Sequence, residues 1–213
     1  SLEKILKEKI SLVGQGRLDA GVHAISQSAH FDTKIKILDI NRFLNRLNFL
    51  LNKSMISILN IKKRNEKFHS RYSAKARIYQ YIILNRESVP TINKNRVWHI
   101  RKKINLENIK RGAKFLVGKK DFSTFRASSC SAKSPIRTLE KVKILKKKNQ
   151  IFIEFRSRSF LQTQVRSMVG CLKYLGEGKW DLKKFKNVTL SKKRIFCAPP
   201  APPSGLFLKK VIY

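Results

Sequence analysis

The segment ARIYQYIIL (Ala76–Leu84) is a candidate for a long β-strand. It is rich in aromatic and β-branched residues, which favour strands over helices. Tyr79 and Tyr81 lie two positions apart, so either one could be an aromatic residue of the core. The segment therefore predicts a long strand, and the elements on either side of it decide the class of fold.

Elements of both kinds flank this strand. Apolar residues recur at helical spacing in Leu2–Ile10, Asp39–Leu51, Asn105–Val117, Phe160–Leu175 and Asp181–Leu190. Strand-like composition marks Val22–Phe31, Met55–Ile61, Val142–Leu145, Ile151–Arg156 and residues 206–213. Helices mixed with antiparallel-type strands indicate an α+β fold. The turn-like stretch around Pro90 is the best candidate boundary, and it divides the chain into residues 1–93 and 94–213.

Composition indicates a globular protein with a real core, because 42% of the 213 residues are hydrophobic. No run approaches the roughly 18 apolar residues of a membrane span. The opening SLEKILKEKI lacks the apolar stretch of a signal peptide, so we expect a cytoplasmic protein with no membrane partner. The three cysteines are widely spaced, a pattern that supports neither a disulfide framework nor a metal site.

The charge of the chain is strongly one-sided. It has 48 Lys and Arg residues against 13 Asp and Glu residues, a formal net charge of +35. A field of this sign favours a polyanionic partner, and nucleic acid is the most common one. The lysines are scattered along the chain, so part of the excess could instead be a compositional bias that produces a solvated lysine surface.

One of the few carboxylates lies in the glycine-rich stretch GQGRLDAGVHA (Gly14–Ala24). Asp19 occupies the position of the third glycine of a dinucleotide fingerprint, and no P-loop or nucleophile elbow is present. A turn that merely accommodates Asp19 is one interpretation. The other is chemical: a carboxylate beside Arg17 stays ionised, and glycines allow a substrate to approach it. Such a group can attack carbon or stabilise charge while the arginine orients it.

Several blocks of the chain, taken in order, resemble the tRNA pseudouridine synthase A (TruA) family. GRLDAGVHA (Gly16–Ala24) is similar to the family's GRTDAGVHA motif, with Leu18 in place of the usual Thr. Family-like blocks follow at Phe68–Asn85, Gly118–Leu139, Ser159–Gly170 and residues 198–213. The resemblance implies a pseudouridine synthase fold, with two mixed halves around a largely antiparallel central sheet. Because the family's opening YDGxxFxGWQxQ segment is not found, we expect either that the sequence is a fragment or that its sheet lacks the family's first strand.

The resemblance also implies an activity: isomerisation of uridine to pseudouridine at positions 38–40, in the anticodon stem-loop of tRNA, without a cofactor. Asp19 would be the catalytic carboxylate, and whether it attacks the base, attacks the sugar or assists a glycal route stays open. Arg17 would hold Asp19 in place. Tyr79 would stack on the base and help remove the C5 proton, and Arg166 would pair with Asp19 or with a phosphate. The residues around Arg166 agree, because it lies on a largely apolar helix and needs a partner there.

Further residues are expected to contact RNA, namely His23, Arg126 and Arg137, although His23 could simply pack against its neighbours. The target uridine would have to be flipped out of its stem. The family implies a homodimer with tRNA as partner. Two alternatives stay open: an RNA-binding protein of the same fold that has lost catalysis, and a pseudouridine synthase that acts on another RNA.

Overall fold

The computed structural model describes all residues, 1–213, and the chain forms two compact units. The first unit comprises Ser1–Gly16 and Ser28–Ser73, and the second comprises Arg17–Gln27 and Ala74–Tyr213. The proposed division of the chain at residue 93 concerns two functional halves rather than these units, and it stays a prediction.

The first unit contains two helices and a small sheet. Helix α1 (Leu2–Leu6) and helix α2 (Ile40–Leu51) share an apolar core, and strands β1 (Val13–Gly14) and β3 (Ala29–His30) pair antiparallel. The Asp39 side chain accepts a hydrogen bond from the backbone N of Arg42 at 2.9 Å. This N-cap confirms the predicted start of the second helix.

Two strand predictions in this part of the chain are wrong. Met55–Ile61 forms no strand, because the Asn48 side chain binds both the N and the O of Ile58, at 2.7 and 2.9 Å. Val22–Phe31 is not one strand but two short ones in different units. The pairing of His23–Ala24 with Phe207 and Leu208 stops early, because the backbone N atoms of Ile25 and Ser26 both donate to the O of Leu208.

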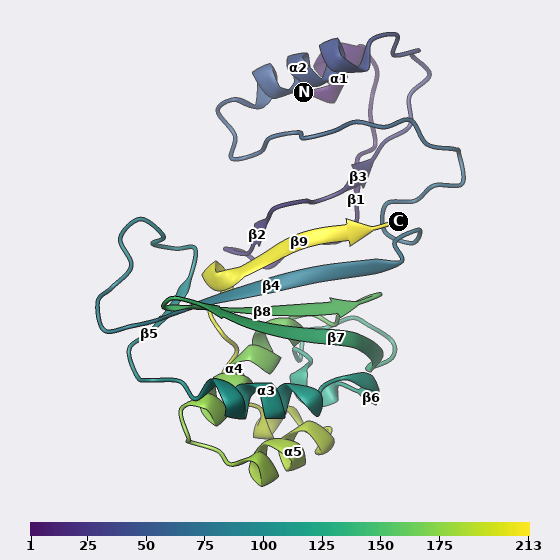
Figure 1. Ribbon diagram of the computed structural model, residues 1–213. Coiled ribbons are helices and arrows are strands. Elements are labelled where there is room, and N and C mark those ends of the chain that lie inside the picture. Colours follow the sequence, from purple (N-terminus) through teal and green to yellow (C-terminus); the bar gives the residue numbers. More distant parts are fainter. The chain divides into compact units, whose positions relative to one another are not determined.

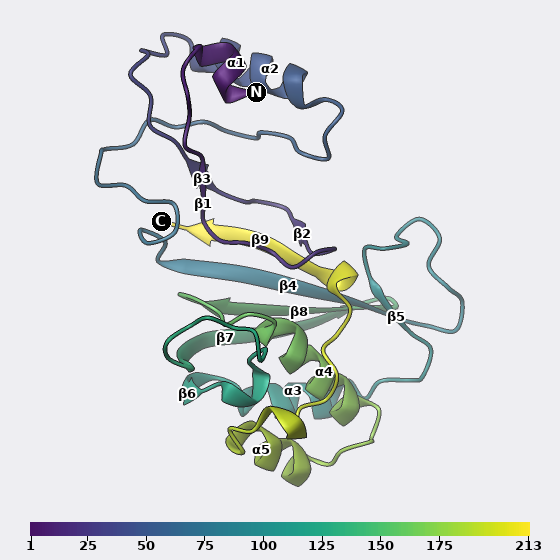
Figure 2. The same cartoon turned by 180° about the vertical axis from the view of Figure 1, so that it is seen from behind.

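The second unit is built on a seven-stranded sheet with the order β2-β9-β4-β8-β7-β6, in which β5 also pairs with β4 (Figures 1 and 2). All its pairs are antiparallel except β2 with β9 and β4 with β5. The strands are β2 (His23–Ala24), β4 (Ala76–Asn85), β5 (Trp98–Ile100), β6 (Gly118–Asp121), β7 (Ile136–Lys147), β8 (Gln150–Ser157) and β9 (Leu206–Ile212). The predicted α+β class with a mainly antiparallel sheet is confirmed.

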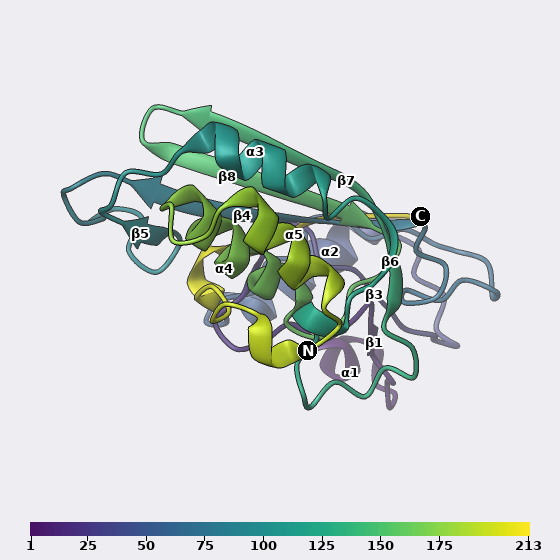
Figure 3. The same cartoon turned by 90° about the horizontal axis from the view of Figure 1, so that it is seen from below.

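Three helices cover one face of this sheet (Figure 3): α3 (Leu106–Lys114), α4 (Gln164–Gly176) and α5 (Leu182–Leu190). Short 3-10 turns lie at Ser123–Phe125, Arg194–Phe196 and Pro203–Gly205. The sheet and the helices share one core, to which α4 contributes Met168 and Leu172 without any exposed surface. The helix predicted to be most buried is thus confirmed, although it begins at Gln164 rather than Phe160. No helix of the chain has both the length and the apolar character needed to cross a bilayer.

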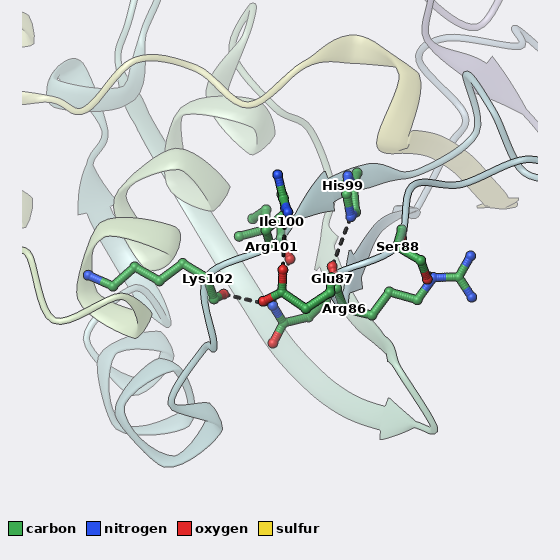
Figure 4. Close-up of polar contacts among 8 residues, drawn as sticks. Arg86, Glu87, Ser88, His99, Ile100, Arg101 and Lys102 are labelled. Carbon is green, nitrogen blue, oxygen red and sulfur yellow. Dashed lines mark hydrogen bonds and ion pairs between the residues drawn. The ribbon is translucent and has the colours of Figure 1, made fainter.

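The long strand β4 is held on both sides, and a side-chain network fixes the chain where the strand ends. Asn85 Nδ2 donates to the carbonyl O atoms of Ile100 and Lys102, both at 2.8 Å. Figure 4 shows His99 directed at Arg86, and its Nε2 donates to the carbonyl O of Arg86 at 2.9 Å. These contacts bring the end of β5 back to the end of β4.

Candidate functional site

Asp19 lies in a tight turn directly before strand β2. Its carbonyl O accepts a hydrogen bond from Val22 N at 3.0 Å, and Gly21 has a φ of 81°. Glycine at the third position of a β-turn allows this left-handed conformation without strain. A Cβ atom on Gly21 would also lie 3.1 Å from Cγ of Pro203. Gly21 therefore allows both the conformation of the turn and the close approach of the turn to Pro203.

The Asp19 carboxylate is paired with Arg166. Arg166 Nη1 donates to Asp19 Oδ2 at 2.8 Å, and its Nε donates to the carbonyl O of Ala201 at 2.7 Å. The two side chains are 18% and 31% exposed, so the pair is only partly shielded from solvent. Because a guanidinium is planar, hydrogen bonds from two of its nitrogens fix its orientation. The sequence predicted that Arg166, on a largely apolar helix, needs a partner. The ion pair with Asp19 confirms this prediction.

The Ala201 carbonyl belongs to residues 198–203, APPAPP, which we call the Pro-rich segment. Ala201 N donates to the O of Arg166 at 3.0 Å, so backbone and side chain of Arg166 both bind this residue. A Cβ atom on Gly170 would lie 2.1 Å from the O of Pro199, so α4 needs glycine there to let the segment approach. The Pro-rich segment is therefore fitted closely to α4.

The same segment is tied to strand β4. Tyr81 is fully buried, and its hydroxyl donates to the carbonyl O of Pro202 at 2.7 Å. A Cβ atom on Gly205 would lie 2.7 Å from Cζ of Tyr81. Burial raises the pKa of Tyr81, although the Arg166 charge acts in the opposite direction. Tyr81 is thus a core residue whose hydroxyl ties the Pro-rich segment to β4.

Tyr79 is only partly buried and lies within electrostatic reach of Asp19. Burial raises the pKa of Tyr79 to about 12; the Arg77 charge lowers it, and the Asp19 charge raises it further. Its ring meets Phe160 edge to face, with centroids 5.2 Å apart. The β4–β9 register shifts between Ile78 and Tyr79, and such bulges are frequent beside active sites. Tyr79 therefore offers a protonated hydroxyl at neutral pH.

Arg17 does not hold Asp19 in this structure. It is exposed, and no hydrogen bond or ion pair joins it to the carboxylate. Leu18, between the two, packs with an apolar cluster that includes Leu208 and Val211. This packing gives the leucine at the family's threonine position a partly buried apolar contact. The holding role expected of Arg17 is taken by Arg166, which sequence adjacency did not suggest.

The three residues expected to contact RNA lie outside this ion pair. The His23 ring stacks on Phe207 with centroids 4.9 Å apart, and its Nε2 donates to the carbonyl O of Asn95 at 2.9 Å. Arg126 Nη2 donates to the carbonyl O of Cys130 at 2.6 Å, and Arg137 Nη1 donates to that of Ser134 at 2.9 Å. Both arginines thus organise the loop that leads into β7.

Two aromatic residues that precede Arg126 belong to the core. Phe122 and Phe125 are each 1% exposed, and their rings lie 6.1 Å apart. No three His, Cys, Asp or Glu side chains of the chain come together as metal ligands. The chemical groups at the site are therefore a carboxylate, the arginine bound to it and a tyrosine hydroxyl.

Comparison with known proteins places this arrangement in a family. A family model described as tRNA pseudouridine synthase matches residues 113–213. The chain is 62% identical to the tRNA pseudouridine synthase A of Pelagibacter ubique (strain HTCC1062), over 100% of this chain and 86% of that protein. It is 44% identical to the one of Bartonella tribocorum, over 97% of this chain and 84% of that protein. Because the similarity covers the Asp19 turn, α4 and the Pro-rich segment together, the chain belongs to the tRNA pseudouridine synthase A family.

Proposed function

We propose that this protein isomerises uridine to pseudouridine at positions 38–40 in the anticodon stem-loop of tRNA, with Asp19 as the catalytic carboxylate. The reaction breaks the C1′–N1 bond, turns the uracil over and joins C1′ to C5, so it has no net redox change and needs no cofactor. One observation carries the proposal: Arg166 holds the Asp19 carboxylate at 2.8 Å and is itself fixed on Ala201. The family's relatives named tRNA pseudouridine synthase A support it.

Each remaining residue has a role in this proposal. Tyr79 contacts the flipped uracil and, with its pKa raised to about 12, acts as a hydroxyl donor rather than as a tyrosinate. Arg17 is exposed beside Asp19 and is free to meet a phosphate of the RNA. His23, Arg126 and Arg137 contribute to RNA binding chiefly by shaping the loops that carry them.

The charge of the protein supports an RNA substrate. Flipping a uridine out of a stem costs a few kcal/mol, which contacts to the RNA backbone and stacking must offset. A net charge of +35 supplies an attraction to phosphates of the kind that dominates binding of structured RNA.

The wider organisation is also proposed. Residues 1–93 form a catalytic half and residues 94–213 complete the site, joined through β4, whose partners β8 and β9 come from the second half. The chain covers 86% of the length of the Pelagibacter protein. The protein acts in the cytoplasm as a homodimer, as the family resemblance implies.

Mapping pseudouridine in RNA treated with the purified protein tests this function. Pseudouridine confined to positions 38–40 of tRNA is the expected result. Pseudouridine in another RNA, with none in the anticodon stem-loop, would favour a different substrate. Tight tRNA binding without any pseudouridine would favour the RNA-binding protein that has lost catalysis.

A further inference from the structure

Two cysteine thiols meet where α4 contacts the chain that leads into the Pro-rich segment. Cys171 Sγ and Cys197 Sγ are 3.5 Å apart, although the residues are separated by 26 positions in the sequence. Cys171 is fully buried on α4, whereas Cys197 is half-buried directly after the Arg194–Phe196 turn. Since sulfurs in a disulfide are about 2.05 Å apart, they would have to approach by only about 1.5 Å.

The surroundings of the two thiols differ in a way that assigns them different roles. Hydrogen bonding from the Cys171 thiol, assisted by the Arg194 charge, lowers the pKa of the Cys197 thiol against the effect of burial. The same hydrogen bond, together with burial, raises the pKa of Cys171. Arg194 is held nearby, because its Nη1 donates to Ser167 Oγ at 2.7 Å. Thiolates are the reactive form of cysteine, so Cys197 is the thiol that reacts first.

We propose that Cys171 and Cys197 are a site of reversible oxidation, at which a peroxide converts the two thiols into an intramolecular disulfide. The Cys197 thiolate attacks one peroxide oxygen, the O–O bond breaks, and a sulfenic acid and hydroxide form. The Cys171 sulfur then attacks Cys197 Sγ, its proton is lost, and the sulfenic oxygen leaves as water. In total two thiols and one hydrogen peroxide give one disulfide and two waters. The oxidation of these thiols does not require the proposed RNA activity.

The disulfide would reinforce a junction on which Arg166 depends. Arg166 and Cys171 lie on α4, while Cys197 precedes the Pro-rich segment whose Ala201 binds the Arg166 guanidinium. Gly170 already abuts Pro199 at this junction. A covalent link there closes a loop in the unfolded chain, which stabilises the folded state relative to the unfolded one. The oxidised protein should therefore melt several degrees higher than the reduced protein.

The experiment treats the fully reduced protein with hydrogen peroxide and follows intact mass, free thiols and peptides. The expected result is the loss of two hydrogens per chain, a single linked peptide pair that contains Cys171 and Cys197, and reversal by dithiothreitol. Cys130→Ser is the matched control and should behave like the parent, because Cys130 has no thiol partner in the structure. Cys171→Ala should form no disulfide and should accumulate a sulfenic acid on Cys197 that dimedone traps.

Three results would overturn the proposal. One is a parent protein that keeps all thiols free while a control disulfide-forming protein reacts. Another is a link that includes Cys130. The third is the same loss of two hydrogens in Cys197→Ser, a variant that lacks the reacting thiol but keeps Cys171 and the fold around it. Circular dichroism of each variant separates these results from a failure to fold.

Discussion

The Arg166 guanidinium and the Asp19 carboxylate meet at 2.8 Å although 147 positions separate them in the chain. Arg166 is not free to follow the carboxylate, because its Nε is bound to the carbonyl of Ala201. The ion pair therefore transmits the position of the Pro-rich segment to the carboxylate proposed to do the chemistry.

Replacing Asp19 tests that chemistry directly. Asp19→Asn keeps the size of the side chain but removes its charge and its nucleophilic oxygen, so pseudouridine formation should fall by several orders of magnitude. Tritium release from C5-labelled tRNA measures turnover, since C5 loses its hydrogen when C1′ joins it. Binding of tRNA should change little, because a carboxylate does not attract phosphate. Asp19→Glu, which moves the carboxylate by about 1 Å, should cost on the order of 100-fold. Turnover at the parent rate in Asp19→Asn would show that the turn carrying Asp19 has only a structural role.

Arg166→Lys tests the double anchorage. A lysine ammonium can meet Asp19 but cannot also reproduce the guanidinium bond to Ala201 in fixed geometry. We expect kcat to fall about 100-fold while the KM for tRNA changes less. Arg156→Lys is the matched control, because Arg156 pairs with Glu140 at 2.8 Å on the exposed hairpin. An equal loss in both variants would mean that the effect does not come from the bond between Arg166 and Ala201.

Gly170→Ala tests the fit of the Pro-rich segment. At an exposed position inside a helix, a change from glycine to alanine stabilises the fold by up to about 1 kcal/mol. Here the added Cβ would lie 2.1 Å from the backbone O of Pro199, so we expect a net destabilisation of about 1–3 kcal/mol and lower activity. Gly14→Ala is the control, since a Cβ there has no atom within 4 Å. Thermal melting of both variants shows whether Gly170→Ala stabilises or destabilises the fold.

The tyrosine at the site predicts a pH dependence at high pH. The pKa of Tyr79 is raised to about 12 from 10.0, so the folded state holds its proton more tightly than the unfolded state. The resulting stability is complete below pH 10 and is lost as the pH rises from about 10 to 12. Tyrosinate absorbance and thermal melting across this range should show the loss, and Tyr79→Phe should reduce it. Tyr72→Phe, at an exposed tyrosine, should leave it unchanged.

Salt dependence tests how much of the charge serves RNA binding. If phosphates hold the tRNA, log Kd should rise linearly with log salt concentration. A flat response between low and physiological salt would assign the +35 charge mainly to composition. Neutralising Lys183 and Lys184, both exposed on α5, should weaken tRNA binding less than Arg166→Gln does. Filter binding over a salt series gives both comparisons.

Local signals in the sequence predicted much of the fold. The start of α2 at Asp39, strands in β7 and β8, and the buried helix α4 follow from residue type and spacing, and the structure contains them. Met55–Ile61 has the composition of a strand, but a single side chain, Asn48, takes the backbone groups that a strand partner would need. Composition cannot reveal such a competitor, because it depends on the tertiary position of one residue.

The sequence likewise predicted some parts of the candidate site and not others. The apolar surroundings of Arg166 pointed to a partner, and Asp19 is that partner. Adjacency favoured Arg17, which is exposed instead. The Ala201 carbonyl was beyond reach of sequence reasoning, because every residue has a carbonyl and only the fold selects one of them. The family-like ending of the chain was the single signal that marked this segment.

The order of strands in the sheet has a consequence for how the protein is made. Strand β2, which follows the Asp19 turn, joins the sheet only through β9, and β9 lies between β2 and β4. During translation the Asp19 turn leaves the ribosome early, but its place in the sheet does not exist until β9 has emerged. A nascent chain stalled before Leu206 would therefore carry every proposed catalytic residue but lack the strand that ties the Asp19 turn into the sheet.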